Sequence, residues 1–69
     1  MEPRNALTIR EQEVLVRIVN GLTNKEIADN LNLSVHTITT HRRNISTKLQ
    51  IHTVAGLTIY AISNKMINK

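Results

Sequence analysis

Two Thr-x-x-Glu steps constrain the fold of this chain more than any other feature. The first is formed by Thr8 and Glu11, and the second by Thr23 and Glu26. In such a step the threonine side chain accepts a hydrogen bond from the backbone amide of the glutamate, and the carboxylate accepts one from the amide of the threonine. Apolar residues at helical spacing follow both steps. Each step therefore predicts the start of a helix.

Signals for helix ends and for further helix starts complete the pattern. Gly21 and Asn32 tolerate the left-handed backbone conformation that commonly closes a helix. Ser34 and Thr53 are good N-caps for two more helices. The predicted helices span residues 9–20, the stretch between Thr23 and Asn32, residues 35–49 and residues 54–64.

Length and composition fit one small all-helical domain. The chain has 69 residues, 41% of them hydrophobic, and its core must come from Leu, Ile and Val because Tyr60 is the only aromatic residue. We expect an all-α fold, a compact four-helix bundle over residues 7–66, behind a flexible N-terminal tail over residues 1–6. Cysteine is absent from the sequence, and no apolar run reaches the roughly 18 residues that span a bilayer. We therefore expect a cytoplasmic protein.

Charge is distributed unevenly along the sequence. All five acidic residues lie within the first 29 positions, together with four basic residues. Residues 30–69 contain no acidic residue and five basic ones, which are Arg42, Arg43, Lys48, Lys65 and Lys69. A half of the chain whose charges are all positive favours a polyanionic partner. The alternative that charge alone leaves open is a basic surface that only contacts solvent.

The predicted helix over residues 35–49 has two unlike sides. Ile38, Ile45 and Leu49 are its apolar positions. The opposite side is polar and free of acid, and it consists of His36, Thr39, Thr40, Arg43 and Thr47. With the short turn at residues 32–34 before it, this helix is the second half of a helix-turn-helix. Such a helix fits the major groove of DNA, where its outward side chains reach the base edges.

The predicted helix over residues 54–64 is apolar on more than one side. One stripe consists of Val54, Leu57 and Ala61, and another of Ile59, Ile62 and Met66. A small core needs only one stripe, so the second predicts a partner subunit, with a well-wrapped terminal helix as the simpler alternative. We expect a homodimer, and we assign its interface to Val54, Leu57, Tyr60 and Ala61.

Three segments carry a longer pattern whose anchor residues keep their relative spacing. They are Leu7-Thr8-x-Arg10-Glu11-x-Glu13-Val14-Leu15, Gly21-Leu22-Thr23-Asn24-Lys25-Glu26-Ile27-Ala28 and Leu33-Ser34-x-x-Thr37-Ile38-x-x-His41-x-x-Asn44-Ile45-x-x-Lys48-Leu49. The pattern resembles the LuxR/NarL (GerE-type) DNA-binding domain of bacterial transcription regulators. The resemblance implies a four-helix domain whose third helix reads DNA and whose fourth helix contacts a second copy. In this family the domain usually follows a receiver or ligand-sensing domain.

The resemblance also implies roles for individual residues. Arg43 is the strongest candidate for reading guanine, while Thr39 offers a methyl group to thymine and a hydroxyl to a base or phosphate. We predict base contacts from Thr39, Thr40, Arg43 and His36. We predict contacts to the DNA backbone from Lys25, Asn24, Thr37, His41, Arg42 and Lys48. Glu11 and Glu26 are expected to stabilise the fold by capping and local ion pairing.

The sequence thus predicts sequence-specific binding of double-stranded DNA by a dimeric transcription regulator, with RNA polymerase as a further partner. No cofactor and no metal are expected. Catalysis is not expected either, because the acids serve mostly as caps, and His36 and His41 do not share a helix face. Two alternatives stay open. One is the promoter-recognising fourth region of a sigma factor, which shares the Thr-x-x-Glu opening and the Glu-Ile-Ala step, and the other is a helical protein-interaction module.

Overall fold

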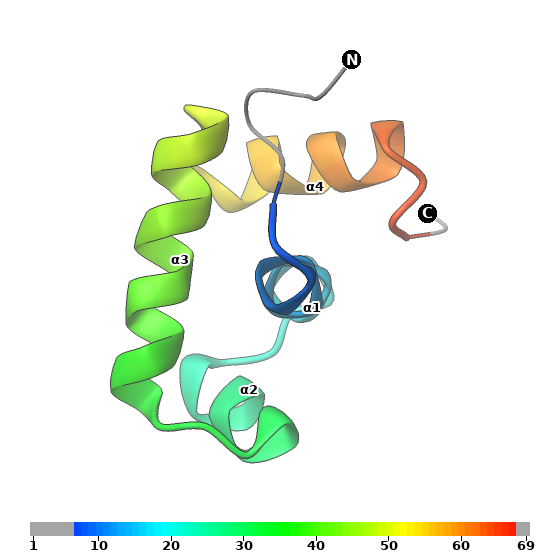
Figure 1. Cartoon of the computed structure of the whole chain (residues 1–69). Coiled ribbons are helices and arrows are strands. Elements are labelled where there is room, and N and C mark those ends of the chain that lie inside the picture. The colour runs from blue at the N-terminus through cyan, green and yellow to red at the C-terminus, as the bar shows by residue number, and fades with distance from the viewer. Residues whose placement is uncertain (1–6, 68–69) are drawn as a thin grey trace.

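Side-chain caps start all four helices of the computed structural model, which describes residues 7–67. Thr8, Thr23, Ser34 and Thr53 each accept a hydrogen bond from the backbone amide three residues further on, and both Thr-x-x-Glu steps form complete capping boxes. The helices are α1 (Ile9–Val19), α2 (Asn24–Leu31), α3 (Val35–Leu49) and α4 (Val54–Ser63), and residues 7–67 contain no strand (Figure 1). The all-α prediction is confirmed. The tail predicted over residues 1–6 lies outside the described residues.

The helices end largely where the sequence predicts. Asn32 closes α2 in the left-handed region, with φ of 62°. Gln50 closes α3 in the same way, with φ of 57°. Helices α1 and α4 each end one residue earlier than predicted, because Asn20 and Asn64 leave helical geometry while their amides still bond to carbonyls of the last turn.

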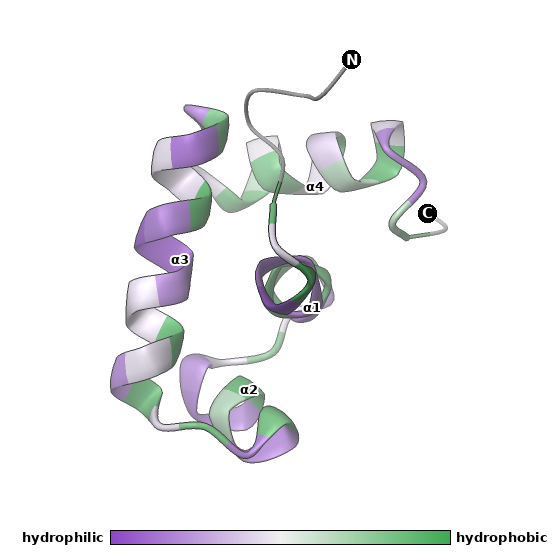
Figure 2. Ribbon diagram, in the orientation of Figure 1, coloured by the Kyte–Doolittle hydropathy of each residue, from purple (hydrophilic) through white to green (hydrophobic). Residues whose placement is uncertain are grey.

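Helix α1 is the centre of the packing. It contacts each of the other three helices, and α2 also contacts α3. In the view of Figure 1, α1 is seen end-on, with α3 along one side of it and α4 and α2 above and below. The side chains at the centre of the core have no exposed surface; they are Val14, Leu15, Ile27, Ile38, Ile45 and Ala61. Each helix therefore contributes an apolar side to the core, as the colours of Figure 2 show for α3.

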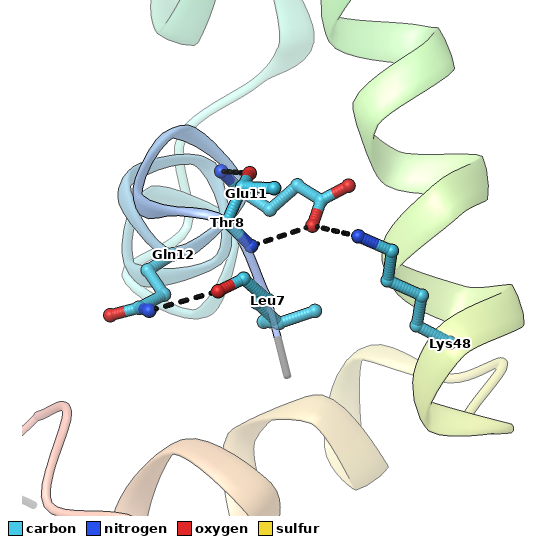
Figure 3. Close-up of polar contacts among 5 residues, drawn as sticks. All are labelled: Leu7, Thr8, Glu11, Gln12 and Lys48. Atoms are coloured by element: carbon cyan, nitrogen blue, oxygen red, sulfur yellow. Dashed lines mark hydrogen bonds and ion pairs between the residues drawn. The ribbon is translucent and has the colours of Figure 1, made fainter. Parts of the chain in front are cut away.

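An ion pair ties the start of α1 to the end of α3. The Oε1 atom of Glu11 accepts hydrogen bonds from the Thr8 amide at 2.9 Å and from the Lys48 ammonium at 2.7 Å (Figure 3). Burial acting alone would raise the pKa of Glu11, because its side chain is only 5% exposed. The hydrogen bonds from Lys48 and Thr8 and the charge of Lys48 outweigh burial, so the pKa of Glu11 lies below its ordinary value. The carboxylate is charged at neutral pH and joins the two helices.

Gly56 makes room for the turn between α3 and α4. A Cβ atom at this position would lie 2.6 Å from Cγ2 of Ile51 and 3.1 Å from the hydroxyl of Thr53. Real Cβ atoms essentially never approach another carbon as closely as 2.6 Å. A side chain at residue 56 would therefore force Ile51 of the same chain to shift.

We expect Gly56→Ala to lower the free energy of unfolding by about 1 kcal/mol. The overlap with Ile51 costs roughly 1–3 kcal/mol, which exceeds the helix preference of alanine over glycine, about 1 kcal/mol. Urea denaturation measures the change. The loss should disappear in an Ile51→Ala background, where the obstructing methyl group is gone. A Gly56→Ala variant that is more stable than the original chain would contradict the packing described for α4.

We expect Lys48→Met to lower the free energy of unfolding at pH 7 by about 1–2 kcal/mol, since a charged hydrogen bond is lost but the ammonium is partly solvated. The folded-state pKa of Glu11 is lowered, so its stabilising effect is complete above the ordinary value of 4.5 and disappears as pH falls through the folded-state pKa. The deficit of Lys48→Met should therefore shrink in acid.

Denaturant titrations between pH 7 and pH 3 test this dependence. The matched control is Arg10→Met, which removes the ion pair between Arg10 and Glu13 at 3.2 Å, where both side chains are more than 40% exposed. Such an exposed pair contributes at most about 0.5 kcal/mol in a helix. A Lys48→Met deficit of the same size at pH 7 and pH 3 would show that Glu11 is not its partner in solution.

Candidate nucleic-acid interface

The apolar residues of α3 decide which of its sides is open to solvent. Ile38 and Ile45 are both fully buried in the contact with α1 and α2. They lie two helical turns apart on one side, so the opposite side of α3 points away from the rest of the domain (Figure 2). That outward side consists of His36, Thr39, Thr40, Arg43 and Thr47; Thr40 is half-buried and the other four are exposed. The predicted polar stripe is therefore accessible, and we call it the outward face of α3.

Positive charge near this face is not neutralised within the domain. The acidic residues of the described chain all lie on α1 and α2, and both ion pairs found within residues 7–67 use carboxylates of α1. Arg42 and Arg43 have no carboxylate partner among the described residues. A basic surface without acids attracts a polyanion and repels another basic surface.

The first turn of α3 is held by a small hydroxyl network. The amide of Thr37 donates to the Ser34 hydroxyl oxygen at 3.0 Å, and the two hydroxyl oxygens lie 2.8 Å apart. Further along, the hydroxyl of Thr39 donates to the carbonyl of Val35, and that of Thr40 to the carbonyl of His36, both at 3.2 Å. The last two bonds fix the side chains of Thr39 and Thr40 against the helix backbone, and the Thr37 side chain is held by the Ser34 cap.

Lys25 and Asn24 lie on the first turn of α2, at the end of that helix opposite to the turn that leads into α3. Lys25 is exposed and makes no ion pair within residues 7–67, and Asn24 is half-buried. Helix α2 packs against α3, and the two are joined by the short turn at residues 32–34. The helix-turn-helix predicted from the sequence is present.

His41 and Lys48 lie toward the inner flank of α3. His41 stands between Ile38 and Ile45 along the helix, and its Nδ1 atom is buried with no hydrogen-bond partner in the described structure. The ammonium of Lys48 is engaged by Glu11. One of these groups is buried and the other is paired within the domain, and the DNA contacts predicted for the two residues stay predictions.

One exposed residue extends the outward face beyond the predicted set. Asn44 lies four residues after Thr40, at the border between the outward face and the flank that bears His41. Its amide can both donate and accept hydrogen bonds. The sequence signal was its spacing from Thr40, which places both side chains on neighbouring turns of one helix side.

The structure corrects part of the predicted dimer surface. Leu57 is 5% exposed and Ala61 is fully buried, so both belong to the core of a single chain and are not available to a partner. Tyr60 is half-buried and packs against the same core. The apolar side chains that α4 exposes are Val54 at 50%, Ile59 at 65% and Ile62 at 41%. Periodicity could not show which of two apolar stripes faces inward.

The described residues offer neither a metal-binding cluster nor a membrane-spanning helix. Within residues 7–67 no three histidines, cysteines or acidic residues come together in a way that could hold a metal ion. None of the four helices combines the length and the apolar character that crossing a membrane requires.

Comparison with known proteins places this fold in a family. The model of bacterial regulatory proteins of the luxR family matches residues 5–61. Transcriptional regulatory protein MctR of Rhizobium johnstonii is 44% identical over 68 residues, which are 99% of this chain and 32% of MctR. Transcriptional regulatory protein LiaR of Bacillus subtilis is 39% identical over 66 residues, which are 96% of this chain and 31% of LiaR.

A third relative, the uncharacterized response regulatory protein YgeK of Escherichia coli, is 56% identical over 48 residues, or 70% of this chain and 33% of YgeK. The chain spans about a third of the length of these curated relatives. The family match begins before α1 and ends within α4, so it includes the whole helix-turn-helix. The chain therefore belongs to the luxR family of bacterial regulatory proteins, and its four helices form the helix-turn-helix domain of that family.

Proposed function

We propose that this chain is the sequence-specific DNA-binding domain of a transcriptional regulator and that α3 enters the major groove of double-stranded DNA. The observation that carries the proposal is the outward face of α3, which is polar, accessible and free of acid. A major groove about 12 Å wide admits one α-helix, and the side chains of its outer side then meet the base edges. Helix α2 lies behind α3, where the first helix of such a motif crosses the DNA backbone.

The contacts divide by chemistry. Arg43 carries a planar donor pair that matches the O6 and N7 acceptors of guanine, so it is the principal base-reading residue, beside Thr39, Thr40 and His36. The other polar side chains around this face meet phosphates. They are Lys25, Asn24, Thr37, Arg42 and, at the edge, His41 and Lys48. Phosphate contacts fix the register of the helix, and base contacts supply the sequence preference.

Pairing through α4 supplies the affinity that one small domain lacks. A single α3 reaches only a few base pairs, whereas two domains on half-sites about 10 base pairs apart add their contacts. Ile59 and Ile62 lie three residues apart on the exposed side of α4, and Val54 is exposed at its start. We propose that these side chains form the contact between two copies, in place of the buried Leu57 and Ala61.

The relatives suggest the wider setting. Two of them are named transcriptional regulatory proteins and one a response regulatory protein. We propose that this domain serves as the output part of a signal-responsive regulator in the cytoplasm, and that RNA polymerase is a further partner of the DNA-bound dimer. A helical protein-interaction module is the competing function, and duplex affinity that falls steeply with salt distinguishes DNA binding from it.

We expect Arg43→Ala and Lys25→Ala to weaken DNA binding in different ways. The test uses the duplex selected by the protein from a random pool and a scrambled duplex. Arg43→Ala should reduce the preference for the selected duplex by roughly 10–100-fold, since one good base contact supplies about 1–3 kcal/mol of discrimination. Lys25→Ala should weaken binding to both duplexes by the same factor. It should also reduce the slope of log affinity against log salt by ~0.9, the contribution of one phosphate contact.

Arg10→Ala is the matched control, because Arg10 is an exposed arginine on α1, remote in sequence from α3. It should change neither the preference nor the salt slope by more than the error of the titration. Equal losses on both duplexes for Arg43→Ala would refute its reading role. Absence of any duplex binding in dilute buffer would refute the proposed function itself.

We expect the double substitution Ile59→Glu and Ile62→Glu to abolish cooperative binding to a duplex with two half-sites, because four carboxylates would then meet at the contact between copies. Affinity for a single half-site should change little. Gel-shift titrations on duplexes with one and two half-sites measure both quantities. Ile9→Glu, at a site on α1 that is 76% exposed, is the control. Unchanged cooperativity in the α4 variant would exclude this surface as the dimer contact.

A further inference from the structure

We infer that Thr39 and Thr40 select A·T base pairs through the methyl group of thymine, an assignment that rests on the proposed function of α3. Each threonine presents a methyl group, and the base that this group favours is thymine. The hydroxyl geometry within α3 carries the inference.

Both hydroxyl protons are used within the helix. The Thr39 hydroxyl donates to the carbonyl of Val35 and the Thr40 hydroxyl to the carbonyl of His36, each at 3.2 Å. A threonine hydroxyl has one proton and two acceptor lone pairs. Each side chain is thus left with a methyl group and an acceptor oxygen to present to a partner. Bonds of this kind, four residues back along the helix, require no change of backbone when the helix meets DNA.

The major-groove pattern of the bases then decides which pair fits. Guanine presents two acceptors there and demands a donor, which a threonine with its proton engaged does not offer. Thymine presents a methyl group, and adenine presents the donor N6 amino group beside its N7 acceptor. An A·T pair therefore offers a threonine two contacts. The thymine methyl packs against the threonine methyl, and the adenine N6 amino group donates to the threonine hydroxyl oxygen. Cytosine in a G·C pair offers an amino donor but no methyl group.

The position of Arg43 predicts where this thymine lies. Arg43 stands four residues after Thr39 and three after Thr40, so the three side chains are neighbours on the outward face of α3. Residues four apart along a helix are separated by about 6 Å, which corresponds to roughly two base pairs at about 3.4 Å each. The favoured thymine should thus lie within about two base pairs of the guanine that Arg43 reads.

Deoxyuridine substitution tests the methyl group directly. The probe is the duplex that the protein selects from a random pool, with each thymine replaced in turn by deoxyuridine, which lacks only the methyl group. One or two thymines per half-site, next to the guanine, should each lower affinity about fourfold when replaced, the factor for burial of one methyl-sized group at ~0.8 kcal/mol. Fluorescence anisotropy measures the affinities.

Variants connect the effect to the threonines. Thr39→Val and Thr40→Val keep the methyl group, so both should retain the deoxyuridine effect at its full size. Thr39→Ser and Thr40→Ser remove it, so in one of them the thymine and deoxyuridine duplexes should bind equally. Thr58→Ser is the matched control, since the Thr58 hydroxyl donates to the carbonyl of Val54 at 2.9 Å in the same manner on α4. It should leave the deoxyuridine effect unchanged.

The outcomes separate this inference from the function on which it rests. If the protein binds its selected duplex but no thymine near the guanine responds to deoxyuridine, or if the response persists in both serine variants, the methyl assignment is overturned and DNA binding stands. If Thr39→Val and Thr40→Val each abolish the preference for the selected duplex, the hydroxyl rather than the methyl group does the reading. If no duplex is bound at all, the proposed function fails first.

Discussion

The contact of Ile38 and Ile45 with α1 and α2 fixes the rotation of α3 about its own axis, and the rest of the molecule depends on it. Both side chains are fully buried, and they lie two turns apart. Rotation of α3 by even a quarter turn would expose isoleucine and bury threonine or arginine, at a cost of about 1.5–3 kcal/mol for each apolar side chain brought into water. The same packing that forms the core therefore presents the polar residues outward.

Glu11 links this orientation to the start of α1. One carboxylate oxygen completes the N-terminal cap of the central helix and also binds the last lysine of α3 (Figure 3). The isoleucines set the rotation of α3, while the ion pair near its C-terminal end restrains its angle to α1. A buried carboxylate is costly without such partners. The carboxylate that secures α3 thus belongs to α1 and not to the outward face.

The parts of this fold that the sequence predicted are those that depend on hydrogen bonds between near neighbours. Thr8, Thr23, Ser34 and Thr53 cap their helices as predicted, and α3 spans the predicted residues. The polar side of α3 could be predicted from periodicity, because α3 has a single apolar stripe, which must face the core and leaves the opposite side to solvent. Features that depend on distant contacts did not follow.

Three residues illustrate that limit. Lys48 was expected to reach DNA, yet its partner in the free domain is Glu11, 37 residues away in the sequence. Leu57 was expected at a dimer contact, yet it is buried in the core, because two apolar stripes on α4 are equivalent until the position of α1 is known. Gln50 adopts a left-handed conformation that glutamine does not signal, since the turn into α4 imposes it. Long-range packing decided the first two, and the turn into α4 decided the third.

Nuclear magnetic resonance titration of the labelled domain with its selected duplex tests the central claim most directly, because it observes every residue of α3 at once. If α3 enters the major groove, the largest changes should occur in the amide and methyl signals of the outward face, from His36 to Thr47, with small changes at the buried Ile38 and Ile45. Changes confined to the exposed sides of α1 or α4, with the signals of Thr39, Thr40 and Arg43 unmoved, would contradict this claim.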